Sequence, residues 1–424
     1  MLETYFVQPQ TVDRIRGLWI GPEIERYVAQ LAERGYSTRT ILRRVPILAR
    51  FGDFARARGA VAVGDLPAHV DAFVAEWVRR ERPVRTGELF GPQVAKEVRG
   101  PIEDLLELVV PGFAGTGRPH RGDPFVDAAA GFFEYLVSER GLRPATIQEY
   151  RHHLHRFELY LKRIGVCRLE DLSPAILSAF VADRAATGMA RTTLRDACGV
   201  LRVFLRYAHR QGLLQSDLSK TVEWPQAYRL STIPRSISWE EVGKVLGAVD
   251  RRTPSGKRDY AILLLLVTYG LRAREVAALT LDDIDWKHDR LAIPERKAGH
   301  ATAFPLSTAV GNALAAYLQH GRPPQAGDRH VFFRAQAPIQ PISAAAVSSR
   351  ATHYLREAGI AVARPGSHTL RHTCVQRLVD ADFTLDTIGD FVGHRSPAST
   401  EIYAKVAVEA LRQVALGDGE EVLA

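Results

Sequence analysis

The N-terminal half of the chain contains an internal repeat, which restricts the possible folds more than any other feature. Residues 27–74 align with residues 133–180 without a gap, at an offset of 106 positions. The copies share turn residues in the same register: Gly35 with Gly141, Gly59 with Gly165, and Asp65-Leu66 with Asp171-Leu172. Because a glycine after a helical run ends the helix, each copy predicts three helices separated by turns. The repeat predicts two related helical modules, although amphipathic helices also resemble one another by chance.

Two segments without helical periodicity divide the chain further. Residues 112–124 are polar and rich in glycine and proline, and residues 226–238 show no clear period. Such segments are typical of linkers. We therefore predict an extra N-terminal helical module at 1–111, a second helical module at 125–225 and a third domain at 239–424.

The third domain mixes helical patterns with short runs typical of strands. Candidate strands lie at 284–286, 290–294 and 301–305, with turn residues between them. Short connections of this kind favour antiparallel pairing. The predicted fold class is therefore mainly α with a small antiparallel β-sheet.

Composition excludes several classes of protein. Of 424 residues, 46% are hydrophobic and 25% are charged, which is ordinary for a globular chain. The three cysteines lie far apart and outside any Cys/His ligand pattern, which argues against disulfides and structural zinc. The longest apolar run, Ile262–Val267, is much shorter than the ~20 residues that span a bilayer. The N-terminal residues also lack a signal-peptide pattern. We therefore expect a cytoplasmic protein with no membrane partner and no bound metal.

Basic residues exceed acidic ones, with a net charge of +8 and a pI near 9.5. This excess fits a polyanionic partner such as nucleic acid, but many enzymes without one share it. One predicted helix of the second copy begins with Arg191 and carries further arginines at spacings that place them on one face. They are Arg195, Arg202, Arg206 and Arg210. This stripe is a candidate DNA-binding surface, although a solvated face has the same pattern.

The first copy also carries a basic helix, with Pro46 near its middle. Its arginines are Arg39, Arg43, Arg44 and Arg50. Because proline lacks the N–H that a helix interior needs, we expect Pro46 to kink or break this helix.

Four short segments of the third domain carry residues suited to chemistry on an anion. In TYGLRAREVAAL, Gly270 ends an apolar helix, so Arg272 lies at a tight corner. A guanidinium there either pairs with a carboxylate or binds an anion. In RKAGH, Lys297 lies at the tip of the predicted hairpin, where a lysine is usually only solvated.

The other two segments lie at helix ends. In SHTLRH, Ser367 is the expected N-cap of a helix that places His368 and Arg371 near its positive end. In VGHRSPASTEIY, a glycine ends a helix before His394, and Tyr403 lies about two turns into the next helix. Taken singly, each segment has an ordinary structural explanation, such as a histidine that binds a local carbonyl.

Together, the order and spacing of the segments resemble the tyrosine recombinase (phage integrase) family. Its boxes read TGLRxSEL, GKGxKxRxVPL, HxLRH and LGHxxxxxTxxIY, against YGLRAREVAAL, RKAGHATAFPL, HTLRH and VGHRSPASTEIY here. The positions of the family's active-site set are occupied by Arg272, Lys297, His368, Arg371, His394 and Tyr403. The resemblance is close over 235–415 and looser over 125–225, which matches the family's SAM-like core-binding domain. Residues 1–111 are an addition to the minimal layout.

The resemblance implies an enzyme that breaks and rejoins DNA strands without metal, cofactor or ATP. Tyr403 would attack a phosphodiester to give a 3′-phosphotyrosine, while the two arginines offset the charge on the phosphate. His368 would act in acid–base catalysis, Lys297 would protonate the leaving 5′ oxygen, and His394 would bind the phosphate or position the tyrosine. The expected partners are double-stranded DNA at specific recombination sites, further copies in a homotetramer on two DNA sites, and accessory or co-encoded recombinase proteins. The resemblance therefore also predicts that the protein is associated with the nucleoid in a bacterial cytoplasm.

Several functions remain open at this point. A site-specific recombinase, the integrase or transposase of a mobile element, is favoured by the extra N-terminal module. A type IB topoisomerase would use the same chemistry as a monomer, and a recombinase that resolves chromosome dimers would use it for another task. A DNA-binding protein without activity is disfavoured because all six active-site positions are occupied by the expected residues.

Overall fold

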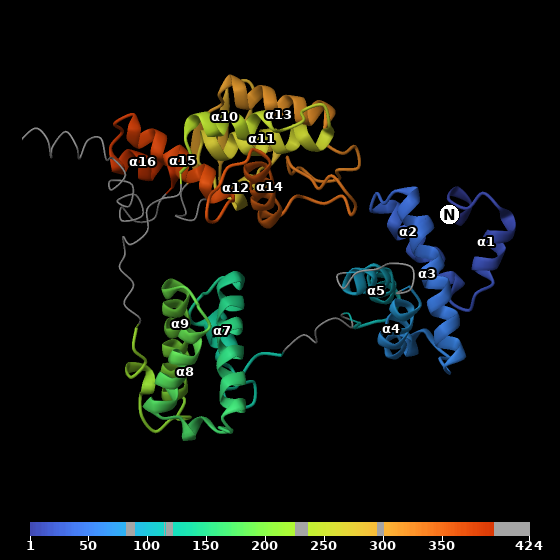
Figure 1. The fold of residues 1–424 in the computed structure, drawn as a ribbon, viewed down its shortest axis with the longest axis horizontal. Helices are drawn as coiled ribbons and strands as arrows, with labels where there is room; N and C mark the ends of the chain where they lie inside the picture. The colour runs from blue at the N-terminus through green and yellow to red at the C-terminus, as the bar shows by residue number, and fades with distance from the viewer. Residues whose placement is uncertain (82–89, 114, 116–121, 225–235, 295–300, 394–424) are drawn as a thin grey trace, which may run out of the picture. The chain divides into compact units, whose positions relative to one another are not determined.

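The structure, a computed structural model, describes most of the chain (Figure 1). The described residues are 1–81, 90–113, 115, 122–224, 236–294 and 301–393. They are mainly helical with one three-stranded antiparallel sheet, as the sequence predicts. The chain divides into two compact units, one formed by 1–113 with 232–424 and the other by 114–231.

The N-terminal helices enclose a hydrophobic core of their own. They are η1 (Leu2–Thr4), α1 (Pro9–Arg16), α2 (Gly21–Glu33), α3 (Thr38–Ala57), η2 (Val63–His69), α4 (Val70–Glu81) and α5 (Phe90–Val109). Helix α3 runs through Pro46 without a break. Of the expected kink or break, a break does not occur, because buried residues on both sides of the proline, such as Val45 and Leu48, pack into the core and hold both turns. Pro46 itself is exposed, so its ring meets solvent.

The basic helix of this module is also less uniform than its sequence suggests. The side chain of Arg44 is mostly buried and donates a 2.6 Å hydrogen bond to Tyr27 Oη and a 2.8 Å bond to Asp104 Oδ2. Arg44 therefore joins α3 to α2 and α5 inside the module and does not belong to a solvated basic face. Arg39 and Arg43 are exposed.

The second unit has a similar order of elements. Its helices are α6 (Phe132–Ser138), α7 (Pro144–Arg163), η3 (Leu169–Asp171), α8 (Pro174–Ala186), α9 (Arg191–Arg210) and η4 (Leu218–Lys220). Helices α3 and α7 both have 20 residues and begin 106 positions apart, the offset of the sequence repeat. The glycines before them, Gly35 and Gly141, both have positive φ, at 74° and 56°. Equivalent turns in the two copies therefore have equivalent backbone conformations.

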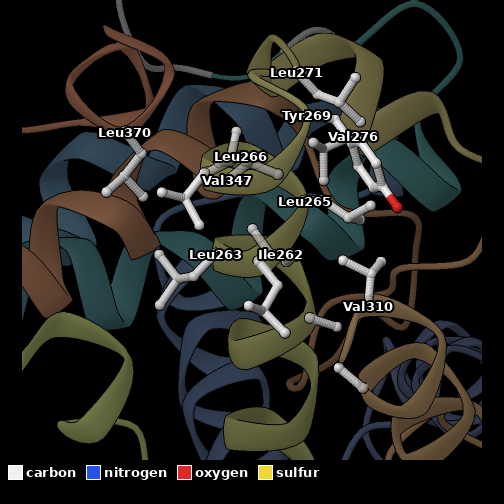
Figure 2. Packing of buried hydrophobic residues seen from close by; sticks show 14 of the residues in the cluster. Ile262, Leu263, Leu265, Leu266, Tyr269, Leu271, Val276, Val310, Val347 and Leu370 are labelled. Carbon is white, nitrogen blue, oxygen red and sulfur yellow. The ribbon is translucent and has the colours of Figure 1, made fainter. Parts of the chain in front are cut away.

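The C-terminal part of the first unit is built around one buried helix. Its elements are α10 (Trp239–Gly247), α11 (Pro254–Thr268), α12 (Ala273–Ala278), η5 (Leu281–Asp283), β1 (Ile284–Asp285), β2 (Arg290–Ile293), β3 (Thr302–Pro305), α13 (Thr308–His320), α14 (Ala344–Glu357), α15 (Ser367–Asp380) and α16 (Leu385–Val392). Helix α11 contacts α10, α12, α13, α14 and α15. Figure 2 shows its side chains packed among Val310, Val347 and Leu370 of the surrounding helices. This core fixes the two ends of α11, one of which carries the candidate site.

The small sheet has the predicted antiparallel topology, with strand order β1-β2-β3. In its register Leu291 lies opposite Phe304 and Ile293 opposite Thr302. Strands β2 and β3 therefore form the two sides of a hairpin. Within the described parts of the chain, no helix is both long enough and apolar enough to cross a membrane.

Candidate functional site

Arg272 lies at the turn between α11 and α12. Gly270 takes the left-handed conformation, with φ of 58°, and ends α11 so sharply that Arg272 becomes the N-cap of α12. Glu275, which is fully buried, accepts hydrogen bonds from both the Arg272 backbone N–H (2.9 Å) and Arg272 Nη1 (2.8 Å). A second donor, Nη2, bonds to the Gly393 carbonyl at 2.7 Å. The guanidinium is thus held from two sides, with 17% of its side chain accessible.

Arg371 lies in the first turns of α15 and is buried. Its Nη1 donates to the Gly270 carbonyl, and its Nη2 donates to the Val392 carbonyl at 2.7 Å. The N-cap of α15 is Gly366 and not Ser367, because the extended backbone of Gly366 leads into the helix and Ser367 is already its first residue. This shift by one residue leaves His368 and Arg371 in the first two turns, as predicted.

Both arginines therefore meet at the C-terminus of α16. Val392 and Gly393 are its last helical residue and its C-cap, and Gly393 is left-handed with φ of 66°. Carbonyls at a helix C-terminus lack partners within the helix and carry partial negative charge, so they suit guanidinium donors. His394 follows directly in the sequence. The two guanidinium groups are thus aligned by the segment that leads to the predicted histidine.

His368 is accessible to solvent next to these arginines. Partial desolvation lowers the pKa of its imidazole below the usual 6.5, and the positive charges of Arg371 and Arg272 lower it further. The imidazole is therefore neutral near pH 7, with one ring nitrogen available as a proton acceptor. Two cations beside a neutral base suit a site that binds an anion and accepts a proton.

The other three predicted catalytic residues lie outside the described residues. Lys297 belongs to the connection between β2 and β3, and His394 and Tyr403 follow α16. The described structure therefore unites three of the six positions: Arg272, His368 and Arg371.

The candidate DNA-binding stripe lies on α9. Arg191, Arg195, Arg206 and Arg210 are exposed. Arg202 differs, because its Nε donates to the Val222 carbonyl at 2.9 Å and its guanidinium lies over the Trp224 ring, 4.9 Å from the centroid. Its position on the helix predicted exposure, but the segment after α9 folds back and covers it. Arg202 therefore has a structural role that the spacing alone did not indicate.

Sequence reasoning missed the carbonyl acceptors of Gly270, Val392 and Gly393. A backbone carbonyl carries no residue-type signal, so nothing in the motif letters identifies it as an arginine partner. The helix-ending glycines beside the motif residues were the available hint. For a metal, the described residues hold no group of three or more His, Cys, Asp or Glu side chains placed to bind one.

Comparisons with known proteins identify the family of this chain. The model of the phage integrase family matches residues 235–410, and that of the phage integrase N-terminal SAM-like domain matches residues 129–212. The Sinorhizobium fredii protein named "Putative integrase/recombinase y4rA" is 32% identical over 391 residues, 91% of each chain. The tyrosine recombinase XerD of Mycobacterium tuberculosis is 30% identical over 303 residues, which cover 68% of this chain and 95% of XerD.

Solved structures show the same fold. The XerH site-specific recombinase bound to a palindromic difH substrate, in its post-cleavage complex, aligns with a TM-score of 0.55 at 16% identity. The alignment covers 83% of this chain and 96% of XerH. The match to y4rA over 91% of the chain and the two matched domains show that the chain belongs to the phage integrase family of tyrosine recombinases, enzymes that cleave and rejoin DNA.

Proposed function

We propose that this protein is a site-specific DNA recombinase, the integrase or transposase of a mobile element, that forms a 3′-phosphotyrosine through Tyr403. The convergence of Arg272 and Arg371 on the end of α16 carries the proposal. It places two cations side by side, next to a neutral imidazole, immediately before the segment that contains His394 and Tyr403. That is the charge distribution that a phosphodiester under attack requires.

The proposed reaction assigns one task to each group. The arginines bind the non-bridging phosphate oxygens and stabilise the charge that develops in the transition state. His368 accepts a proton, Lys297 protonates the 5′ oxygen as its bond to phosphorus breaks, and His394 hydrogen-bonds a phosphate oxygen or positions Tyr403. Because the phosphotyrosine conserves the energy of the phosphodiester, rejoining by the 5′-hydroxyl needs no ATP. The cationic side chains supply the charge that a metal supplies in other phosphoryl transfer enzymes.

The extent of the matches favours a mobile element over the resolution of chromosome dimers. The match to XerD leaves about a third of this chain uncovered, whereas the match to y4rA covers 91% of it. The additional N-terminal part is therefore shared with a relative whose name describes an integrase/recombinase. A type IB topoisomerase activity is the second candidate, since it needs the same catalytic groups.

The proposal includes the assembly and the domains. A homotetramer on two DNA sites, with accessory or co-encoded recombinases, performs the strand exchange at the bacterial nucleoid.

Residues 1–111 act as an additional DNA-contacting or protomer-contacting module, since α3 repeats α7 at the same offset and length. Replacing the exposed Arg39 and Arg43 by glutamate in the full chain should then weaken DNA binding or pairing of sites, while cleavage of a nicked site persists. Unchanged binding and recombination would contradict this role.

A covalent-trap experiment tests the proposed chemistry. Nicked duplexes that tile the DNA on both sides of the gene are incubated with the wild-type protein in EDTA and analysed on a denaturing gel. A nick just beyond the cleaved bond releases a short 5′-hydroxyl fragment, so the protein cannot rejoin the strand and the adduct accumulates. We expect a protein–DNA adduct at one or a few tiles.

The Tyr403→Phe variant is the matched control, because it removes the nucleophilic oxygen and keeps the ring. An adduct that this variant also forms, or one that requires a divalent cation, contradicts the proposed mechanism. Relaxation of supercoiled plasmid with no preferred site would favour the topoisomerase. Recombination between two copies of the trapped site on one plasmid would favour the recombinase.

A further inference from the structure

Three aromatic rings join structural elements that lie next to the proposed catalytic groups in the sequence. Tyr269 follows α11, Phe304 lies on β3 and Phe391 lies on α16. The ring centroids of Tyr269 and Phe304 are 5.0 Å apart, and those of Phe304 and Phe391 are also 5.0 Å apart, with the second pair edge to face. Tyr269 and Phe304 are buried, at 4% and 3% exposure, and Phe391 is partly buried. We refer to these three residues as the aromatic row.

The first ring of the row also fixes the end of β3 through its hydroxyl. Tyr269 Oη donates to the Pro305 carbonyl at 2.8 Å and accepts from the Ser307 backbone N–H at 3.0 Å. Tyr269 is three residues before Arg272, so the corner that holds this arginine is joined directly to the strand. Figure 2 shows Tyr269 beside Leu265, within the packing around α11.

The middle ring anchors β3, the strand that follows Lys297 in the sequence. Phe304 lies opposite Leu291 in the β2–β3 ladder, which has four residue pairs. A ladder this short does not by itself set the direction of its hairpin, because short two-stranded ribbons are marginally stable and strongly twisted. Burial of Phe304 against two further rings supplies the contact that fixes the strand on the domain.

The last ring of the row leads to the arginines. Phe391 directly precedes Val392 and Gly393, whose carbonyls accept from Arg371 and Arg272. The aromatic row therefore connects the backbone that aligns both guanidinium groups with the strand that leads to Lys297. Two of its positions fall within the family boxes, which have threonine where this chain has Tyr269 and valine where it has Phe304.

We propose that Tyr269, Phe304 and Phe391 are positioning residues that hold β3, the strand that follows Lys297 in the sequence, in register with the arginine pair, and that Lys297 depends on this anchoring for its action. The tilted Tyr269–Phe304 pair and the edge-to-face Phe304–Phe391 pair are closely packed, so the row transmits the position of α16 to β3 more precisely than small aliphatic side chains do. Proton transfer to the leaving oxygen is sensitive to displacement of the acid, whereas a well-anchored arginine is less affected. The inference rests on the proposed role of Lys297 as the general acid.

The test compares two leaving groups in single-turnover cleavage of the nicked duplex identified in the covalent-trap experiment. One substrate has the normal 5′ bridging oxygen, and the other has sulfur in its place. In both, Tyr403 Oη bonds to phosphorus and the bond to the bridging atom breaks. The oxygen must take a proton, because an alkoxide is too basic to leave readily, but a thiol has a pKa of about 8.5 and leaves as a thiolate. A defect in proton donation is therefore corrected by sulfur.

We expect Phe304→Val and Phe391→Leu to cleave the oxygen substrate about 10- to 100-fold more slowly than wild type. The same variants should cleave the sulfur substrate within about threefold of wild type, since that step needs no general acid. Phe391→Leu keeps most of the side-chain volume at a partly buried position, so it remains informative if Phe304→Val does not fold. DNA affinity should be unchanged in both, because neither residue contacts solvent extensively.

Two controls separate the possible outcomes. Phe332 is fully buried and stacks on Tyr317 at 5.4 Å in the same domain, outside the aromatic row, so Phe332→Val measures general loosening of the core. It should not distinguish oxygen from sulfur. Lys297→Ala should be slow with oxygen and restored by sulfur.

If sulfur restores Lys297→Ala but not the aromatic variants, the positioning role is wrong and the proposed function stands. The positioning role is also wrong if sulfur restores the cleavage rate of Phe332→Val as much as that of the aromatic-row variants. It is wrong as well if the aromatic-row variants cleave the oxygen substrate as fast as wild type. If sulfur does not restore Lys297→Ala, Lys297 is not the general acid, and the inference fails together with that part of the proposed function.

Discussion

Replacing Glu275 by glutamine tests how Arg272 is held in the candidate site. The change keeps the size and shape of a fully buried side chain and removes its negative charge. Glu275 accepts two hydrogen bonds from Arg272, one from the backbone N–H and one from Nη1, and each uses a different carboxylate oxygen. A glutamine has one acceptor oxygen, so its NH₂ group must face one of these donors.

The expected effect follows from the loss of that one bond. A hydrogen bond to a charged group contributes about 1.5–3 kcal/mol, and here the acceptor is a carboxylate buried from water. If the whole loss appears in the transition state, cleavage slows about 10- to 150-fold, at about 1.4 kcal/mol for each tenfold change. Arg272 keeps its bond to the Gly393 carbonyl, so the side chain stays in the site but turns more freely.

Single-turnover formation of the covalent adduct, with DNA affinity measured in parallel, gives the result. Glu241→Gln is the matched control, because Glu241 closes a capping box on the exposed start of α10, where it accepts from the Ser238 N–H at 2.8 Å. We expect the control to cleave at the wild-type rate. A Glu275→Gln enzyme within twofold of wild type, or a control slowed to the same extent, would refute the reasoning.

Four further predictions concern the same structure. Gly270→Ala should destabilise the domain by about 2 kcal/mol and lower its melting temperature by roughly 4–8 °C. The reason is that φ of Gly270 is 58° and a Cβ there would lie 3.1 Å from Val392 Cγ1. A loss of stability below about 1 kcal/mol in calorimetry would count against this. In the DNA-free protein, the NMR signal of His368 should titrate below pH 6.5, because the pKa of its imidazole is lowered and the ring gains its proton only as the pH falls. The His368→Gln variant assigns the signal. A titration midpoint above pH 6.5 would contradict the described environment. Arg206→Ala should reduce the slope of log affinity against log salt by about 0.9 if it binds one phosphate. Arg202→Ala should instead lower thermal stability with little change in slope, because this side chain holds the Val222 carbonyl.

Much of the fold was predictable because it depends on local signals. The repeat predicted equivalent helices, and α3 and α7 have the same length at the predicted offset. The sheet followed from short β-rich runs separated by turns, and its antiparallel order is as predicted. A break at Pro46 did not occur, because the cost of a proline inside a helix is local, whereas the burial that offsets it, at Val45 and Leu48, comes from packing against other helices.

The candidate site likewise contains residues that the sequence predicted and a contact that only the folded chain shows. Motif letters identified Arg272, His368 and Arg371, and the structure brings these three together. Arg202 had the periodicity of a surface residue, but the chain after α9 returns to cover it, an event that no local pattern encodes.

The sequence by itself determined the family, the helical modules and the identity of the candidate catalytic groups, because residue type fixes chemistry and local spacing fixes helices and turns. The tertiary structure decided what holds those groups in place. The Val392, Gly393 and Gly270 carbonyls align the arginines, and the aromatic row connects three elements that are distant in the chain. Backbone acceptors and ring contacts of this kind exist only after the chain has packed, since they join residues more than 20 positions apart whose letters carry no sign of one another.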